Sequence, residues 1–73
     1  MTAVSIDSAL SAWGLTSLLR TLGDLFVRFP RASNVDIAEA LHRAAVKMLP
    51  HGNVVGLLLR ARYEMRLIIA AGA

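Results

Sequence analysis

The segment VVGLLLRARYEMRLIIA, residues 54–70, carries apolar side chains on two opposite sides of a helix. At about 100° per residue, one broad face collects most of them: Val54, Leu57, Leu58, Ala61, Met65, Ile68 and Ile69. A second stripe on the other side follows i,i+4 spacing, and charged residues occupy both borders, Arg60 with Glu64 on one and Arg62 with Arg66 on the other. A helix with two apolar faces needs two surfaces to pack against. Because a short chain covers one of them with its own helices, we expect the second to be an interface.

The predicted interface is centred on the second stripe, with arginines at its border to supply polar rim contacts. It comprises three stripe residues, two arginines and one adjoining aromatic residue: Leu59, Tyr63, Leu67, Arg62, Arg66 and Trp13. In the alternative interpretation, an N-terminal helix carrying Trp13 covers the stripe, which is then internal core. Substitution of Tyr63 by arginine separates the two, because it abolishes association in the first case and unfolds the chain in the second.

The length of the chain, 73 residues, predicts one domain spanning residues 1–73. A chain of this size buries only about 60% of the surface that it exposes when unfolded. Cysteine is absent, which excludes disulfides and thiolate metal sites as a source of additional stability. Hydrophobic residues nevertheless make up 56% of the chain, and the mean hydropathy is +0.57. This composition favours association with another copy or with a different protein.

The N-terminal part of the chain changes its helical phase at Gly14. Residues 6–13 predict a short helix that Asp7 caps, whereas an apolar stripe from Leu15 to Phe29 points almost in the opposite direction. Two arrangements remain open: one long helix with different neighbours along its length, or two helices separated by a break. We favour the break, with Thr16 as the cap of the second helix.

The middle of the chain gives the clearest helix signal. Ser33 or Asn34 can cap it, and Asp36 takes the place of the usual Glu or Gln of a capping box. Pro50 and the residues after it end this helix, and Asn53 can cap the next one. The predicted fold is an all-α small helical bundle of three main helices near 16–29, 34–49 and 54–71, with the short N-terminal helix near 6–13.

The charge balance keeps nucleic acid as an alternative partner. Eight basic residues oppose five acidic ones, for a net charge of +3 and a pI near 10.7. The stretch VDIAEALHRAA, residues 35–45, resembles the opening helix of helix-turn-helix domains. In that family a turn follows at once, whereas here the helical pattern continues to Pro50, and the next helix begins with apolar residues instead of base-reading polar ones. A basic, nucleic-acid-associated oligomer is therefore the second interpretation.

A metal site is a remote third interpretation. Glu39 and His42 have the i,i+3 spacing that di-iron helical bundles use, and a dimer would contribute two such pairs and two copies of Glu64. Such a site requires one narrow stripe of this helix to point inward: Val35, Glu39, His42, Val46 and Leu49. Glu39, however, falls on the charged side with Arg43. We expect no catalytic residues and no cofactor, since neither a nucleophile–base set nor a phosphate-binding loop can be recognised.

A fourth pattern is LTSLLRTLGDLF, residues 15–26, which resembles the short death-agonist helix of the apoptosis-regulator family. The matching residues are four apolar anchors and a Gly-Asp pair: Leu15, Leu19, Leu22, Phe26, Gly23 and Asp24. The resemblance implies that the anchors fill a groove of a partner while the aspartate pairs with an arginine. The match covers this one segment.

The membrane is the weaker interpretation of the apolar segments. No uncharged stretch is longer than Ser8 to Leu19, which is shorter than the roughly 20 residues that span a bilayer. The first residues lack the basic region of a secretory signal, so we expect a cytoplasmic protein. The predicted function is that of a small, non-catalytic interaction protein, such as an adaptor, regulator or small subunit, that binds itself or a different protein through helix–helix contacts.

Overall fold

The computed structural model describes residues 13–48 and 53–72 of the chain. These residues form three helices, α2 (Leu15–Arg28), α3 (Asn34–Lys47) and α4 (Val54–Gly72). The predicted all-α bundle and the positions of its three main helices are therefore confirmed, with boundaries that differ by one or two residues. The predicted short helix near 6–13 lies outside the described residues except for Trp13.

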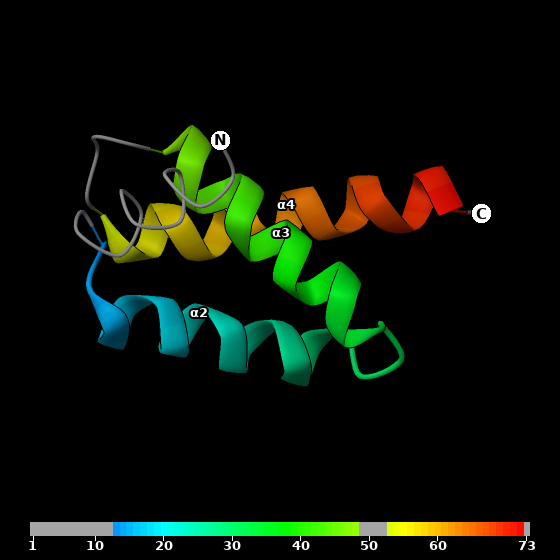
Figure 1. Cartoon of the computed structure of the whole chain (residues 1–73), viewed down its shortest axis with the longest axis horizontal. Coiled ribbons are helices and arrows are strands. Elements are labelled where there is room, and N and C mark those ends of the chain that lie inside the picture. Colours follow the sequence, from blue (N-terminus) through cyan, green and yellow to red (C-terminus); the bar gives the residue numbers. More distant parts are fainter. Residues whose placement is uncertain (1–12, 49–52, 73) are drawn as a thin grey trace.

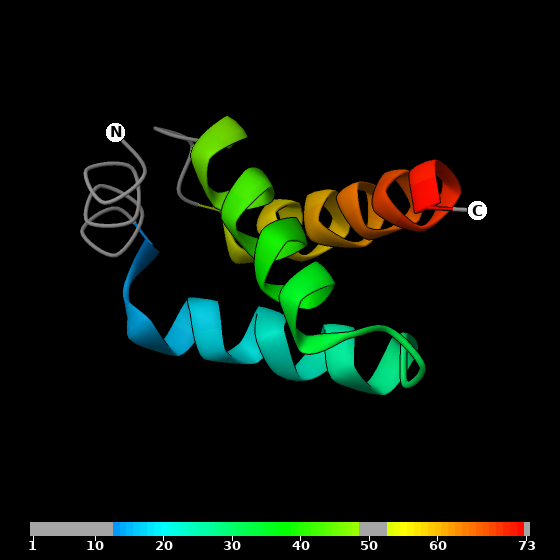
Figure 2. The same cartoon turned by 45° about the vertical axis from the view of Figure 1, so that its right-hand side comes forward.

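The three helices form a small bundle in which α3 crosses the other two. Helices α2 and α4 lie side by side and run in the same direction, and α3 returns obliquely across them (Figures 1 and 2). The contact between α3 and α4 is the largest of the three helix–helix contacts. One side of α4 therefore faces α2 and α3, and its other side faces outward.

Gly14 produces the break between Trp13 and α2. Its φ of 78° and ψ of 155° fall in a region that is essentially restricted to glycine. Helix α2 begins at the next residue, and the Leu18 amide donates to the Gly14 carbonyl at 3.3 Å. The prediction that Thr16 caps this helix is wrong, because Thr16 already lies inside it and Gly14 occupies the cap position without a side-chain hydrogen bond.

Side-chain caps start the other two helices as predicted. The Ser33 hydroxyl accepts a hydrogen bond from the Asp36 amide at 3.1 Å at the start of α3. At the start of α4, the Asn53 side-chain oxygen accepts from the amides of Val55 and Gly56 at 2.9 and 3.2 Å. These bonds satisfy amide groups that have no partner within a helix, so they fix where each helix begins.

The core is formed by a few large side chains and several alanines. All three helices contribute, and the indole of Trp13 donates to the Ala45 carbonyl of α3 at 3.0 Å. Alanines on the facing sides of α3 and α4 let these two helices approach closely. The buried apolar residues are Trp13, Leu25, Ile37, Ala40, Ala44, Ala45, Leu57, Ala61 and Met65.

The apolar stripe predicted for residues 15–29 is divided between the core and the surface. Leu25 is fully buried, while Leu15, Leu19 and Phe26 are exposed. Thr21 is buried in their place, which is possible because its hydroxyl donates to the Ser17 carbonyl one turn earlier at 2.9 Å. The helix is thus rotated from the orientation that its apolar pattern alone favours.

Candidate interaction surface

The predicted stripe lies on the outward side of α4. Leu59, Tyr63 and Leu67 are 55%, 49% and 42% exposed, which is far more than the neighbouring core residues of the same helix. Val55, one turn before Leu59, extends the row and is 62% exposed. The prediction missed Val55 although its i,i+4 spacing was visible in the sequence. Four large side chains of one helix are therefore exposed to solvent in a single row.

Trp13 does not join this row. Its side chain is buried, and its indole hydrogen bond ties it to Ala45 of α3. An aromatic ring with a polar NH is stably buried when that NH finds an acceptor, as it does here. Trp13 is therefore a core residue of the isolated chain, and the five remaining predicted residues all lie on α4.

Arg62 is held in place by an aspartate of the neighbouring helix. Its Nε and Nη2 donate to the two carboxylate oxygens of Asp24 in α2, at 2.9 and 2.8 Å. The hydrogen bond from Arg62, together with the charges of Arg62 and Arg28, holds the pKa of Asp24 below its usual value in spite of partial burial. This two-point contact fixes the guanidinium at the border of the row and joins α2 to α4.

Arg60 and Arg66 complete the basic border of the row. The Arg60 guanidinium lies over the ring of Tyr63, 5.0 Å from its centroid, which is within the range of a cation–π contact. Arg66 is exposed and has no carboxylate partner among the described residues. The sequence placed all three arginines at the borders of α4, and the structure adds that Arg60 restricts the ring of Tyr63.

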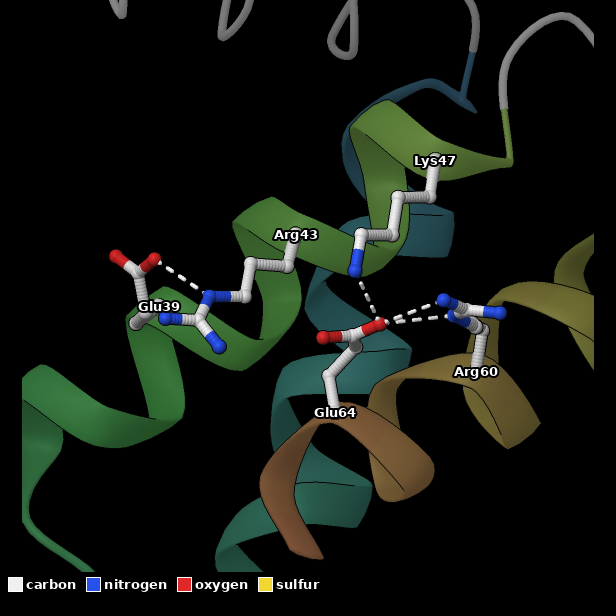
Figure 3. Close-up of polar contacts among 5 residues, drawn as sticks. All are labelled: Glu39, Arg43, Lys47, Arg60 and Glu64. Atoms are coloured by element: carbon white, nitrogen blue, oxygen red, sulfur yellow. Dashed lines mark hydrogen bonds and ion pairs between the residues drawn. The ribbon is translucent and has the colours of Figure 1, made fainter. Parts of the chain in front are cut away.

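Glu64, the one acidic residue of α4, is not on the surface. Its side chain is fully buried, and its Oε2 accepts from Lys47 of α3 and from Arg60, both at 2.9 Å (Figure 3). Its Oε1 is buried, has no hydrogen-bond partner among the described residues and points away from Arg60. The cations that cover the carboxylate are themselves 49% and 36% exposed, so the cluster lies just beneath the surface.

The two cations determine the protonation state of this carboxylate. Burial alone raises the pKa of Glu64, but the hydrogen bonds from Lys47 and Arg60 and the charges of both outweigh it. The pKa of Glu64 is therefore lower than usual, and the group is ionised at neutral pH. The row on α4 thus has a basic border and no exposed carboxylate of its own helix.

The orientation that a metal site required is not found. Val35 is 77% exposed, and Glu39 forms a 2.8 Å surface ion pair with Arg43 (Figure 3). Glu64 is already bound by two cations. Within residues 13–48 and 53–72, no three acidic or histidine side chains gather closely enough to hold a metal ion.

The segment that resembles a death-agonist helix is only partly available for binding. Leu15, Leu19 and Phe26 are exposed, whereas the fourth anchor, Leu22, packs partly against the core. Asp24, which that resemblance assigns to an arginine of a partner, is bound by Arg62 of the same chain. The charged contact implied by the resemblance is therefore made internally.

Comparison with protein-family models, with curated proteins and with solved structures gave no match for this chain. Among the described helices, none combines the length and the apolar character needed to cross a membrane.

Proposed function

We propose that the chain is a small, non-catalytic interaction module that binds a helix of another protein through the outward side of α4. This α4 surface consists of an apolar row and a basic border: Val55, Leu59, Tyr63 and Leu67, with Arg60, Arg62 and Arg66. The observation that carries the proposal is the exposure of these four large side chains on one helix. Exposed apolar rows that are rimmed by polar groups mark binding surfaces.

The surface is already arranged for binding. Asp24 holds Arg62, and Arg60 lies against Tyr63, so these side chains lose little conformational freedom when a partner arrives. Tyrosine and arginine are also the residue types that most often dominate binding energy at interfaces. Tyr63 at the centre of the row is therefore the residue that we expect to contribute most.

The charges of the α4 surface indicate what kind of partner fits it. Arg60 and Arg62 are paired with Glu64 and Asp24, but Arg66 has no carboxylate partner among the described residues, so two copies of this surface that face one another bring two unpaired arginines together and repel each other. A partner helix with acidic side chains beside its apolar row has the opposite charge. We therefore propose a heterologous, acidic, amphipathic helix as the partner.

Two designed peptides test this proposal. Both carry the same leucine row at i,i+3/i+4 spacing, one flanked by glutamates and the other by lysines, and binding is followed by fluorescence anisotropy of a labelled peptide. We expect the glutamate peptide to bind at least about tenfold more tightly at low salt, with a difference that decreases as salt is added. Equal binding of the two peptides, or binding to neither, contradicts the proposal.

A substitution at the centre of the row tests the location of the site. Tyr63→Arg is expected to abolish peptide binding while the far-UV circular dichroism spectrum stays unchanged, because the side chain is half exposed. Leu19→Arg, an equivalent change on the outward side of α2, is the control and is expected to leave peptide binding unchanged. Loss of helicity in Tyr63→Arg would show that the row is core, and unchanged binding would place the site elsewhere.

Nucleic-acid binding has less support than a protein partner. Most described cations are already paired with carboxylates, and those without such a partner lie on three separate elements: Arg20 on α2, Arg31 in the α2–α3 connection and Arg66 on α4. Phosphate backbones are bound by contiguous basic patches. No such patch is formed by these three residues.

A further inference from the structure

A second exposed apolar row lies on α2. Its members, Leu15, Leu19 and Phe26, are 63%, 55% and 44% exposed. At about 100° per residue, all three fall within about 40° of the side of α2 opposite Asp24. Because Asp24 is bound to Arg62 of α4, this row points away from α4. The α2 row is therefore a different surface from the α4 surface.

The α2 row differs from the α4 surface in its charge. Its neighbours on the outward side of the helix are Thr16, Gly23 and Val27, and Val27 is 80% exposed. Arg20 is the one charged residue on this outward side, and it lies one turn before Gly23, on the far side of the helix from Leu15 and Phe26. A chain with a net charge of +3 can approach its own copy most easily where charge is lowest.

Gly23 is unexplained by the fold of the single chain. A glycine in the middle of a helix destabilises that helix relative to alanine. A Cβ atom built at Gly23 meets no atom of residues 13–48 and 53–72 within 4 Å, and the φ of Gly23 is not positive, so neither packing nor backbone conformation requires a glycine. Because Gly23 has no side chain, the outward side of α2 has a shallow depression at its centre, where the backbone of a second helix can approach closely.

We propose that the α2 row is the contact between two copies of this chain, with α2 packed against its symmetry mate and the two helices crossing near Gly23. A twofold contact must be complementary to itself, and an apolar, nearly uncharged row satisfies this condition whereas the arginine-bordered α4 surface does not. In this dimer both α4 surfaces stay exposed, so self-association and partner binding are independent properties of the chain.

The size of the contact sets its expected strength. A helix of 14 residues is about 21 Å long, so one helix pair buries less surface than a standard protein interface of about 800 Å² per partner. Contacts of this size are weak, and we expect a dissociation constant in the micromolar range.

Sedimentation velocity and light scattering over about 1–500 µM protein test the proposal. The wild type is expected to change from monomer to dimer across this range. Leu19→Arg and Gly23→Gln are each expected to raise the dissociation constant at least tenfold, the first by placing charge in the contact and the second by blocking close approach. Tyr63→Arg is the matched control and is expected to leave the dimer intact.

Folding is checked in the same samples. Gly23→Gln is expected to raise the melting temperature of the dilute monomer, because glutamine favours helices more than glycine does and the position is open. A variant that is more helical yet less associated cannot owe its loss of association to unfolding. A wild type that stays monomeric at all concentrations, or a dimer that Tyr63→Arg disrupts and Leu19→Arg does not, overturns the proposal.

Discussion

Single ion pairs in this chain differ in how much they contribute to stability. The Arg62–Asp24 pair joins two helices through two hydrogen bonds, and both side chains are less than a fifth exposed. We expect Arg62→Ala to lower the free energy of unfolding markedly more than the loss of a surface pair does, because it removes two hydrogen bonds that join α2 to α4. Arg43→Ala, which removes a pair within one exposed helix, is expected to cost about 0.3–0.5 kcal/mol. Urea unfolding of both variants measures the difference, and equal losses would contradict the structure.

Two carboxylates also make the stability of the chain depend on pH. The pKa values of Asp24 and Glu64 are lower in the folded chain than their usual values of 3.8 and 4.5, so the unfolded chain takes up protons first as pH falls. Their contribution is complete at neutral pH and is lost as the pH falls through the usual values and then through the lowered folded ones. We expect the free energy of unfolding to decrease from about pH 5 downward.

The double variant Asp24→Asn, Glu64→Gln tests this explanation. It should be less stable than the wild type at pH 7, and its free energy of unfolding should decrease less steeply as the pH falls. An unchanged slope would exclude these two groups as the cause.

At the level of the helices, the connection before α2 depends on one glycine. Gly14 adopts a φ of 78° and a ψ of 155°, a conformation that costs other residues about 1–3 kcal/mol. Gly14→Ala is therefore expected to destabilise the chain by about that amount, although none of the described residues lies within 4 Å of the added methyl group. Gly72→Ala, at an equally open position without a positive φ, is the control and should change stability by less than about 0.5 kcal/mol. Equal effects in thermal or urea unfolding would show that backbone conformation at Gly14 is not the cause.

The helices were predictable because their signals are local. The Ser33 and Asn53 caps, the phase change at Gly14 and the outward row on α4 each depend on residues within a few positions of one another. The rotation of α2 was not predictable in this way. A count of apolar residues favours burial of Leu15 and Leu19, but the contacts with α3 and α4 decide which side is buried, and Thr21 can enter the core by hydrogen bonding its own helix.

At the level of the whole molecule, no pattern in the sequence predicts the contacts that join the helices. Arg62 and Asp24 are 38 positions apart, and Trp13 and Ala45 are 32 positions apart. Glu64 was placed at the border of α4 beside Arg60, and its burial follows only from the approach of Lys47 on α3. The sequence therefore predicts which residues form the border of the candidate surface. It does not predict the pairing with Asp24 that fixes Arg62 in place.

These long-range contacts lead to a test of whether the chain unfolds as one domain. Trp13, the single tryptophan, is buried against α3, so its fluorescence reports tertiary packing, while far-UV circular dichroism reports all the helices. If the helices form one cooperative unit, the two urea curves coincide, with a slope near 1 kcal/mol/M as is typical of a small domain. Ile37→Val, in the core of α3, should shift both curves equally, by about 0.5–1.5 kcal/mol.

Protein concentration is held constant in these measurements, because self-association adds stability that increases with concentration. A fluorescence transition at lower urea than the loss of helicity would show that the Trp13 contact opens before the three helices do, and the chain would then not be a single cooperative domain.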